Sequence, residues 1–287
     1  MFNLPTLIQH LLPHHFLSML AGILAENKFL KYFLIRIFIR FYKIDMNEAL
    51  ITDVNEYSNF NNFFTRKLKT DARPFDLSPN VIVSPADGNV SALGKIAGSQ
   101  LMQAKGHYFF VHDLLGGSKD LEKNFTNGIY TTVYLSPRDY HRVHMPISGK
   151  LVSTIYVPGS LFSVNEATSE SVPNLFARNE RVICIFETRA GPMCLIFVGA
   201  MIVGSIETSW AGEIRPPNNN RKVHRIDYSS LEKPINLAKG DEAGRFKLGS
   251  TVILLFGENA VSLDTQLEIN DPIKMGQNLG MILNQQE

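Results

Sequence analysis

The chain has 287 residues, of which 45% are hydrophobic and 19% are charged, and its formal net charge is +1. These values exclude a disordered, collagen-like or disulfide-stapled chain, and the near-neutral charge argues against a general nucleic-acid-binding protein. The length suits one large domain or two small ones. The two cysteines, Cys184 and Cys194, flank a predicted hairpin turn and could face each other, although buried free thiols are the favoured interpretation.

The N-terminal stretch up to Ala25 contains no Asp, Glu, Lys or Arg. Two prolines and three histidines interrupt it, so its longest clean apolar run, residues 16–24, is far shorter than the ~20 residues that span a bilayer. The chain also lacks the basic start of a secretory signal. We therefore predict neither a membrane span nor a cleaved signal peptide.

Residues 28–43 have the pattern of an amphipathic helix, with bulky apolar residues on one face and cations on the other half. The apolar residues are Leu30, Phe33, Leu34, Ile37, Phe38 and Phe41, and the cations are Lys28, Lys31, Arg36, Arg40 and Lys43. One interpretation is an ordinary helix packed on the protein's own core. The aromatics, the cations and the preceding uncharged stretch favour a helix that lies on an anionic membrane surface. We predict a helical membrane-associating region over residues 1–68.

From Pro74 onward the sequence changes to short β-branched runs separated by Gly, Pro, Asn and Asp. The predicted strands are Val81–Val83, Tyr130–Leu135, Leu151–Val157, Val182–Glu187, Cys194–Val203 and Thr251–Phe256. No regular alternation with long helices occurs, so a doubly wound parallel sheet is not expected. The predicted fold class is α+β, with N-terminal amphipathic helices followed by a β-rich sandwich or barrel-like catalytic core over residues 69–287.

Three short segments carry side chains suited to catalysis. They contain Asp87 before a glycine, His141 and His144 three residues apart, and Ser250 after Gly249. Each pattern alone is typical of a turn. The two histidines could form a zinc pair, but the chain lacks a Cys cluster or a His-Glu-x-x-His helix, so no metal site is predicted and acid–base chemistry is favoured. Together, Asp, His and Ser can activate a serine hydroxyl.

These segments belong to longer stretches that resemble phosphatidylserine decarboxylase proenzymes. The stretches are Pro85-Ala86-Asp87-Gly88, residues 134–146 (YLSPRDYHRVHMP), residues 162–165, residues 172–181, residues 198–206, and Leu248-Gly249-Ser250-Thr251 followed by Val252-Ile253. The last of them is similar to the self-cleavage site of these proenzymes. The resemblance covers nearly the whole chain, including the N-terminal region.

The resemblance implies that the chain cuts itself between Gly249 and Ser250. His144 would remove the Ser250 proton, Asp87 would orient His144, and the serine oxygen would attack the Gly249 carbonyl. The resulting ester would undergo elimination and leave a covalent pyruvoyl group at position 250 as the cofactor. The large chain, 1–249, and the small chain, 250–287, would remain together as a non-covalent heterodimer, which could assemble into a higher oligomer. His141 would then donate a proton to the substrate, with loop packing as its alternative role.

The implied substrate is phosphatidylserine in the membrane, reached by peripheral association with its cytoplasmic face. Arg138 and Arg142 could hold the lipid phosphate, or they could form exposed salt bridges. Two alternative functions stay open. One is a lipid-acting serine hydrolase that uses Asp87, His144 and Ser250, although the Gly-x-Ser-x-Gly elbow is absent around Ser250. The other is a non-catalytic membrane-surface module.

Overall fold

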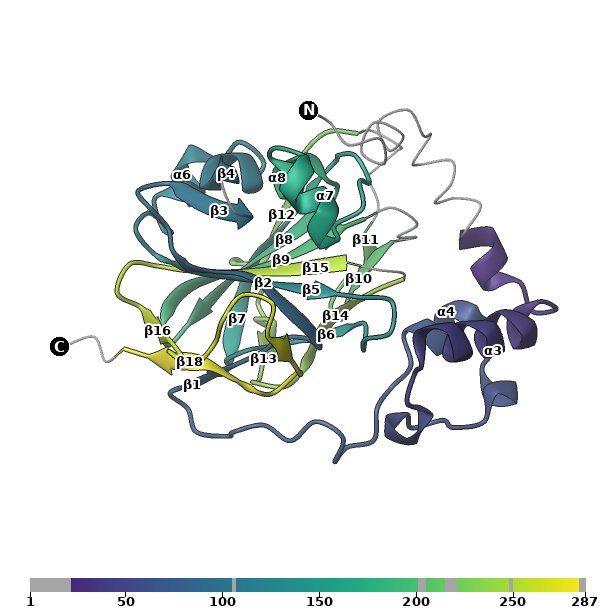
Figure 1. Cartoon of the computed structure of the whole chain (residues 1–287). Coiled ribbons are helices and arrows are strands. Elements are labelled where there is room, and N and C mark those ends of the chain that lie inside the picture. Colours follow the sequence, from purple (N-terminus) through teal and green to yellow (C-terminus); the bar gives the residue numbers. More distant parts are fainter. Residues whose placement is uncertain (1–21, 105–106, 201–204, 215–220, 248–249, 284–287) are drawn as a thin grey trace.

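The computed structural model describes residues 22–104, 107–200, 205–214, 221–247 and 250–283. Its N-terminal part is helical and lies to one side of the stacked sheets (Figure 1). The elements are α3 (Lys31–Tyr42), the 3-10 helices η1 (Met46–Glu48) and η2 (Val54–Glu56), and α4 (Phe60–Phe64). Phe38 of α3 packs edge-on against Phe60 and Phe63 of α4, with ring centroids 5.0 and 6.1 Å apart. These aromatic contacts give the helical part a small core of its own.

A nine-stranded antiparallel sheet forms the centre of the molecule, in the order β12-β7-β8-β9-β15-β5-β2-β17, with β13 also paired to β7. The strands are β2 (Gly88–Lys95), β5 (Ile129–Leu135), β7 (Gly149–Val157), β8 (Arg181–Thr188), β9 (Gly191–Gly199), β12 (His224–Asp227), β13 (Asn236–Leu237), β15 (Ser250–Phe256) and β17 (Pro272–Ile273). Every residue of β15 is buried. Because side chains alternate along a strand, β15 contributes Val252 and Leu254 to one core and Ile253 and Leu255 to the other.

Different layers cover the two faces of this sheet (Figure 1). One face packs on two smaller sheets, β11-β10-β14-β6 and β1-β18-β16. Their strands are β1 (Val81–Val83), β6 (Arg142–His144), β10 (Ile206–Thr208), β11 (Gly212–Ile214), β14 (Glu242–Phe246), β16 (Val261–Leu263) and β18 (Asn278–Ile282). The other face packs on the β3-β4 hairpin (Gln100–Ala104, His107–Phe110) and on the helices α5 (Val111–Leu114), α6 (Lys119–Glu122) and α8 (Leu175–Arg178), and α7 (Glu166–Ser171) packs on β3.

The α+β class predicted from the sequence is confirmed, and the sheets stack without closing into a barrel. Each predicted strand matches an observed one within a few residues at either end. The largest difference is in the predicted strand Cys194–Val203, because β9 ends at Gly199 and residues 201–204 lie outside the described residues. The short runs were predictable because β-branched residues bounded by turn residues favour strands locally.

The two cysteines are free and buried, as favoured, but they do not face each other. In the β8–β9 ladder Cys184 pairs with Leu195, and Cys194 pairs with Ile185. This offset of one residue puts the two thiols on opposite faces of the sheet, one in each core. The expectation that they could face each other was therefore wrong, because it depended on a register that the sequence does not specify.

The helix predicted over residues 28–43 forms as α3, and its apolar residues divide between two surroundings. Leu34 and Phe38 pack on the small helical core around the fully buried Ile35. Phe33, Ile37 and Phe41 point outward and are 65%, 49% and 75% exposed. Among the described residues no helix is long and apolar enough to cross a membrane. The uncharged N-terminal stretch falls outside the described residues up to residue 21.

Candidate active site

Ser250 is the first residue of β15 and is fully buried. It pairs with Leu135 of β5 on one side and with Gly199 of β9 on the other. Within the described residues its Oγ has no hydrogen-bond partner. A buried hydroxyl without a partner is costly, and it leaves this oxygen free to contact another group. Gly249, on the other side of the predicted cut, lies outside the described residues.

His144 ends β6, and its hydrogen bonds define its tautomer. Its Nδ1 lies 2.8 Å from the carbonyl oxygen of Gly240. A carbonyl can only accept, so Nδ1 carries the proton and Nε2 holds the lone pair. The Tyr140 hydroxyl lies 3.0 Å from Nε2 and donates to it, and the two rings stack at 28°. Burial lowers the pKa of His144, so its neutral form is favoured and Nε2 is a base near neutral pH.

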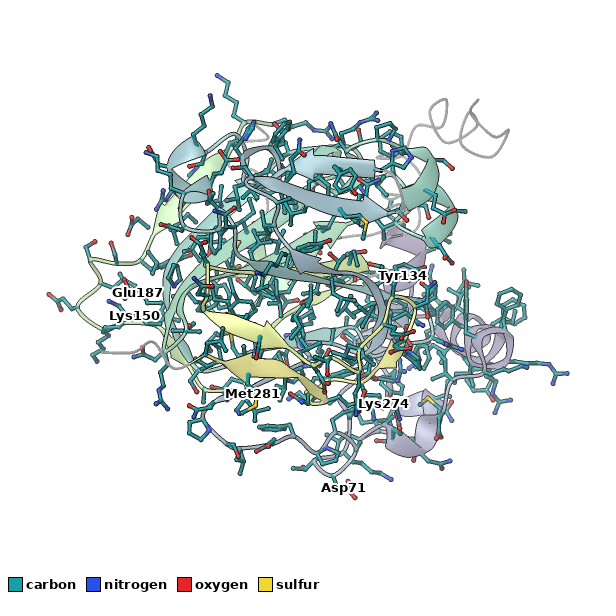
Figure 2. All side chains as sticks on the ribbon, turned by 60° about the vertical axis from the view of Figure 1, so that its left-hand side comes forward. Asp71, Tyr134, Lys150, Glu187, Lys274 and Met281 are labelled. Atoms are coloured by element: carbon teal, nitrogen blue, oxygen red, sulfur yellow. The ribbon has the colours of Figure 1, made fainter. Side chains whose placement is uncertain are left out.

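Asp87 is buried in an ion-pair network that the sequence did not reveal. Arg73 donates to both of its carboxylate oxygens, with Nε at 2.9 and 3.1 Å and Nη2 at 2.5 Å. Arg73 Nη2 also reaches Glu48 at 2.6 Å, and Lys274 pairs with Glu48 at 3.2 Å. Figure 2 shows Lys274, from the C-terminal segment, close to the N-terminal helices. The network therefore connects Glu48 of the N-terminal helical part and Lys274 of the C-terminal segment to Asp87 through Arg73.

The described contacts place Asp87 near His144, and no hydrogen bond among the described residues joins Asp87, His144 or Ser250 to one another. Asp87 bonds to Arg73 and to the backbone N–H of Met275, whereas the carbonyl of Gly240 holds His144. The Asp87 charge still acts on His144 and raises its pKa, although burial has the larger, opposite effect. His144 is thus oriented by Gly240 and Tyr140, while Asp87 influences it through space.

His141 is completely buried, with its ring centroid 4.0 Å from that of Phe64. Its Nδ1 donates to the carbonyl of Asp139 at 2.8 Å, and its Nε2 has no partner among the described residues. Burial lowers the pKa of His141 to about 3, with a smaller contribution from the Arg66 charge. Unliganded His141 is therefore neutral at physiological pH, and it can give up a proton from Nε2 only after a nearby anion has favoured its protonation.

Two arginines that were candidates for holding phosphate differ in their surroundings. Arg138 is 63% exposed at its side chain and lies 3.8 Å from Asp139. Arg142 is buried, pairs with Glu242 at 2.6 Å, and donates from Nε to the carbonyl of Thr65 at 2.9 Å. Arg142 therefore forms an ion pair, but a buried one and not the exposed salt bridge expected, whereas Arg138 is exposed beside Asp139.

A cavity of about 690 Å³ opens beside Tyr134, which pairs with Thr251 in the β5–β15 ladder. Figure 2 shows Tyr134 on the side of the molecule that carries the N-terminal helices. Tyr134 packs against the helix-covered core, whereas Leu135, the partner of Ser250, belongs to the other core. Because side chains alternate, the cavity and the Ser250 hydroxyl lie on opposite faces of the strand.

Sequence reasoning missed Tyr140, Arg73 and the carbonyl of Gly240. Tyr140 lies in the family-like stretch of residues 134–146, four residues before His144. This short separation was the available signal that the Tyr140 hydroxyl could contact the His144 imidazole. Arg73 and Gly240 carried no such signal, because each meets its partner only through the tertiary fold.

Comparison with known proteins decides the family. A family model described as phosphatidylserine decarboxylase matches residues 60–281, and a second model, described as PSD, matches residues 4–43. The chain belongs to the phosphatidylserine decarboxylase family. The resemblance stated from the sequence motifs is thereby confirmed. The matched range of the first model includes all four predicted site residues, Asp87, His141, His144 and Ser250.

Several curated relatives of this family are similar over nearly their full length. A phosphatidylserine decarboxylase proenzyme of Pseudomonas fluorescens is 54% identical over 275 residues, which is 95% of each chain. The proenzyme of Stutzerimonas stutzeri is 53% identical over 95% of this chain and 92% of its own. That of Azotobacter vinelandii is 54% identical over 95% of this chain and 96% of its own.

Proposed function

We propose that this chain is a self-processing enzyme that decarboxylates phosphatidylserine to phosphatidylethanolamine. One observation carries the proposal: Ser250, whose buried hydroxyl has no partner among the described residues, begins the central strand of a chain that aligns over 95% of its length with proteins named phosphatidylserine decarboxylase proenzymes. The alternatives, a lipid-acting serine hydrolase and a non-catalytic module, have no comparable support.

Self-cleavage would use the hydrogen-bonding state of His144. The Ser250 proton would go to Nε2, the only basic atom of this imidazole, after the Tyr140 hydroxyl that now donates to Nε2 has moved aside, and the Gly240 carbonyl at Nδ1 would stabilise the resulting imidazolium. The serine oxygen bonds to the carbonyl carbon of Gly249, and the Gly249–Ser250 peptide C–N bond breaks to give an ester with a free amine on residue 250. Elimination then releases the Gly249 carboxylate, and hydrolysis with loss of ammonia leaves a pyruvoyl group.

Position 250 fits such a group. It is fully buried, its backbone lies between two strands, and its side-chain oxygen has no partner among the described residues. A pyruvoyl carbonyl supplies the sink for the electron pair that carbon dioxide leaves behind. His141 is the candidate proton donor, since its Nε2 has no partner among the described residues and the anionic substrate would favour its protonation. Asp87 would act on His144 through its charge.

We also propose that residues 1–68 associate with the cytoplasmic face of the membrane, peripherally, while residues 69–287 form the catalytic region. The outward row of Phe33, Ile37 and Phe41, with the exposed Arg36 and Arg40 beside it, supports this division. Bulky apolar groups can enter the interface, and the cations favour anionic lipid.

The mass of the denatured protein tests the proposal. Wild-type protein should give two chains, residues 1–249 and a small chain of residues 250–287 whose mass shows a keto group in place of the amine. The Ser250→Ala variant should stay one chain of about 32.2 kDa without decarboxylase activity. The control is Ser262→Ala, which changes an exposed serine of β16 and should be processed normally.

The other outcomes separate the alternatives. An intact, active chain would support the hydrolase, and an intact chain without turnover would support the module. Activity that survives treatment with hydroxylamine, or with borohydride in the presence of substrate, would contradict a pyruvoyl group. The role of His141 is tested in processed His141→Ala enzyme, whose unimpaired turnover would remove it from the mechanism.

A further inference from the structure

Arg66, two residues after α4, is a buried cation that forms no ion pair with any of the described residues. Arg66 as a whole is only 5% exposed. Within the described residues its Nε and Nη1 donate to no acceptor, and its Nη2 has one long bond of 3.4 Å to the carbonyl of Arg138. Its guanidinium also lies 5.5 Å from the Phe63 ring centroid. A guanidinium offers five N–H donors, so most of its donor capacity is unused.

A buried guanidinium in this state is costly, and an anionic ligand would relieve the cost. Arg66 lines a cavity of about 280 Å³ between the helical part and the β6–β14 edge. The charged residues of its lining are Glu56, Arg66, Lys67, Arg142 and Arg245, so cations exceed acids. Arg142 and Arg245 are bonded to Glu242 and Glu207 at 2.6 and 2.9 Å. Arg66 forms no such ion pair among the described contacts.

Arg66 lies between His141, the candidate proton donor, and α3, which carries the exposed apolar row. Toward the interior, Phe64 of the same short segment packs against His141, and the Arg66 charge acts on His141. Toward the exterior, α4 packs on α3, whose opposite side carries the exposed Phe33, Ile37 and Phe41. A headgroup held at Arg66 would therefore lie between the interfacial helix and the candidate proton donor.

We propose that Arg66 binds the phosphodiester of the lipid substrate in this cavity. The inference rests on the proposed function and adds a binding residue to it. In the substrate, only a methylene carbon and an ester oxygen separate the reacting α-carbon from phosphorus, so a phosphodiester bound at Arg66 would hold the α-carbon nearby, and the Arg66 charge already acts on His141. The planar guanidinium fork matches two phosphate oxygens.

The carboxylate of the serine headgroup is the less suitable anion for this site. Its charge disappears as carbon dioxide leaves, so pairing it with arginine would stabilise the substrate more than the transition state and slow the reaction. The phosphodiester keeps its charge from substrate to product. Arg66 can therefore hold it throughout the reaction without opposing the chemical step.

The test compares Arg66→Met with Arg66→Lys and with the control Lys69→Met, which removes a positive charge from an exposed neighbour. All three variants should process themselves, because Arg66 is assigned to the lipid and not to self-cleavage. With short-chain phosphatidylserine in detergent micelles, Arg66→Met should raise KM by about tenfold to a hundredfold, as expected for the loss of a charge-assisted hydrogen bond, and should change kcat much less, through the weaker effect of the Arg66 charge on His141. Arg66→Lys should raise KM less, and Lys69→Met should not.

Short-chain phosphatidylethanolamine, added as a competitor, identifies the anion, because it retains the phosphodiester but lacks the carboxylate. Its inhibition constant should weaken in Arg66→Met in the same proportion as KM. An unchanged inhibition constant beside a raised KM would assign Arg66 to the carboxylate and overturn the proposal. An unchanged KM would also overturn it.

Processing distinguishes this proposal from the proposed function. If Arg66→Met stays uncut, Arg66→Lys provides the KM measurement, and failure of both variants to mature would assign Arg66 to processing or folding and overturn the proposal. If wild-type protein itself neither cuts nor decarboxylates, the proposed function fails, whatever the Arg66 variants do.

Discussion

At the scale of single residues, burial determines how the candidate site is charged. Asp87 and Arg73 have side chains that are 8% and 6% exposed, so each would be costly to leave alone in the interior. Bidentate pairing keeps the carboxylate close to His144 without a hydrogen bond between them. The Asp87 charge therefore acts on His144 only through space and favours the imidazolium weakly, whereas burial is the largest effect and lowers the pKa of His144.

Removing Arg73 should be strongly destabilising. In the uncut Ser250→Ala background, Arg73→Met leaves Asp87 buried without its ion-pair partner, which costs about 3–5 kcal/mol. Lys274→Met removes a cation of the same network that is 58% exposed, and it should cost less than about 1 kcal/mol. Urea unfolding measures both changes. Equal losses for the two variants would contradict the interpretation that the buried pair stabilises this region.

The pH dependence of processing should reflect the lowered pKa of His144. Below its pKa, His144 is protonated and cannot accept the Ser250 proton, so the processing rate falls with pH through that value. Since burial puts the pKa of His144 below its ordinary value of 6.5, the midpoint of this acid limb should lie below 6.5. The measurement is the processing rate of freshly translated precursor across pH.

Tyr140→Phe provides the comparison for this pH profile. The Tyr140 hydroxyl donates to Nε2 of the neutral imidazole and so favours the neutral form. Its removal should move the acid midpoint upward. A wild-type midpoint at 6.5 or above, or a downward shift in Tyr140→Phe, would be incompatible with His144 as the base in this hydrogen-bonded state.

At the scale of elements, α3 has two different apolar sides. The side with Leu34 and Phe38 packs on the helical core, whereas the row of Phe33, Ile37 and Phe41 is exposed. The packing interpretation is therefore observed for one side, and membrane association stays a prediction for the exposed row. Large exposed apolar groups in a row mark an interaction surface.

Membrane binding should depend on the exposed row of α3. The double variant Phe33→Ser/Phe41→Ser removes two aromatic groups that would enter the interface, and each is worth about 1.5–3 kcal/mol when fully buried. Binding to anionic vesicles in a sedimentation assay should weaken by at least about tenfold, with the unfolding midpoint unchanged. Leu77→Ser, at an exposed leucine outside α3, is the control and should bind normally. Equal binding by both variants would assign membrane attachment elsewhere.

At the scale of the whole molecule, the strands of the C-terminal segment pair with strands from earlier parts of the chain. β15 lies between β5 and β9, β17 pairs with β2, and β18 pairs with β1. Asp87 also accepts a hydrogen bond from Met275. A cut before Ser250 would thus leave the small chain inside the central sheet, held by backbone ladders and by two cores.

The two chains should remain associated after processing. We expect them to co-elute in size-exclusion chromatography without denaturant and to separate only in denaturant, because seven consecutive buried residues of β15 pair on both edges. Ile253→Ala, which leaves a cavity in the helix-covered core, should lower the denaturant midpoint by an amount typical of about 2–5 kcal/mol, and Ser262→Ala should not. Release of the small chain in native buffer would refute the heterodimer.

The sequence alone determined the family, the α+β class, the main strands, and the helical pattern of residues 28–43. These are local properties, since β-branched runs, helical periodicity and family motifs involve residues close together in the chain. The motifs also named Asp87, His141, His144 and Ser250, although not what each of them touches.

Only the tertiary structure decided which residues contact the candidate site residues. Gly240 lies 96 residues from His144, and Lys274 lies 226 residues from Glu48, so no local pattern could pair them. The same holds for the opposite faces of the two cysteines, which depend on a one-residue register, and for the unmatched charge of Arg66. Pairing, register and burial arise when distant segments pack together, and the chemistry of the candidate site depends on all three.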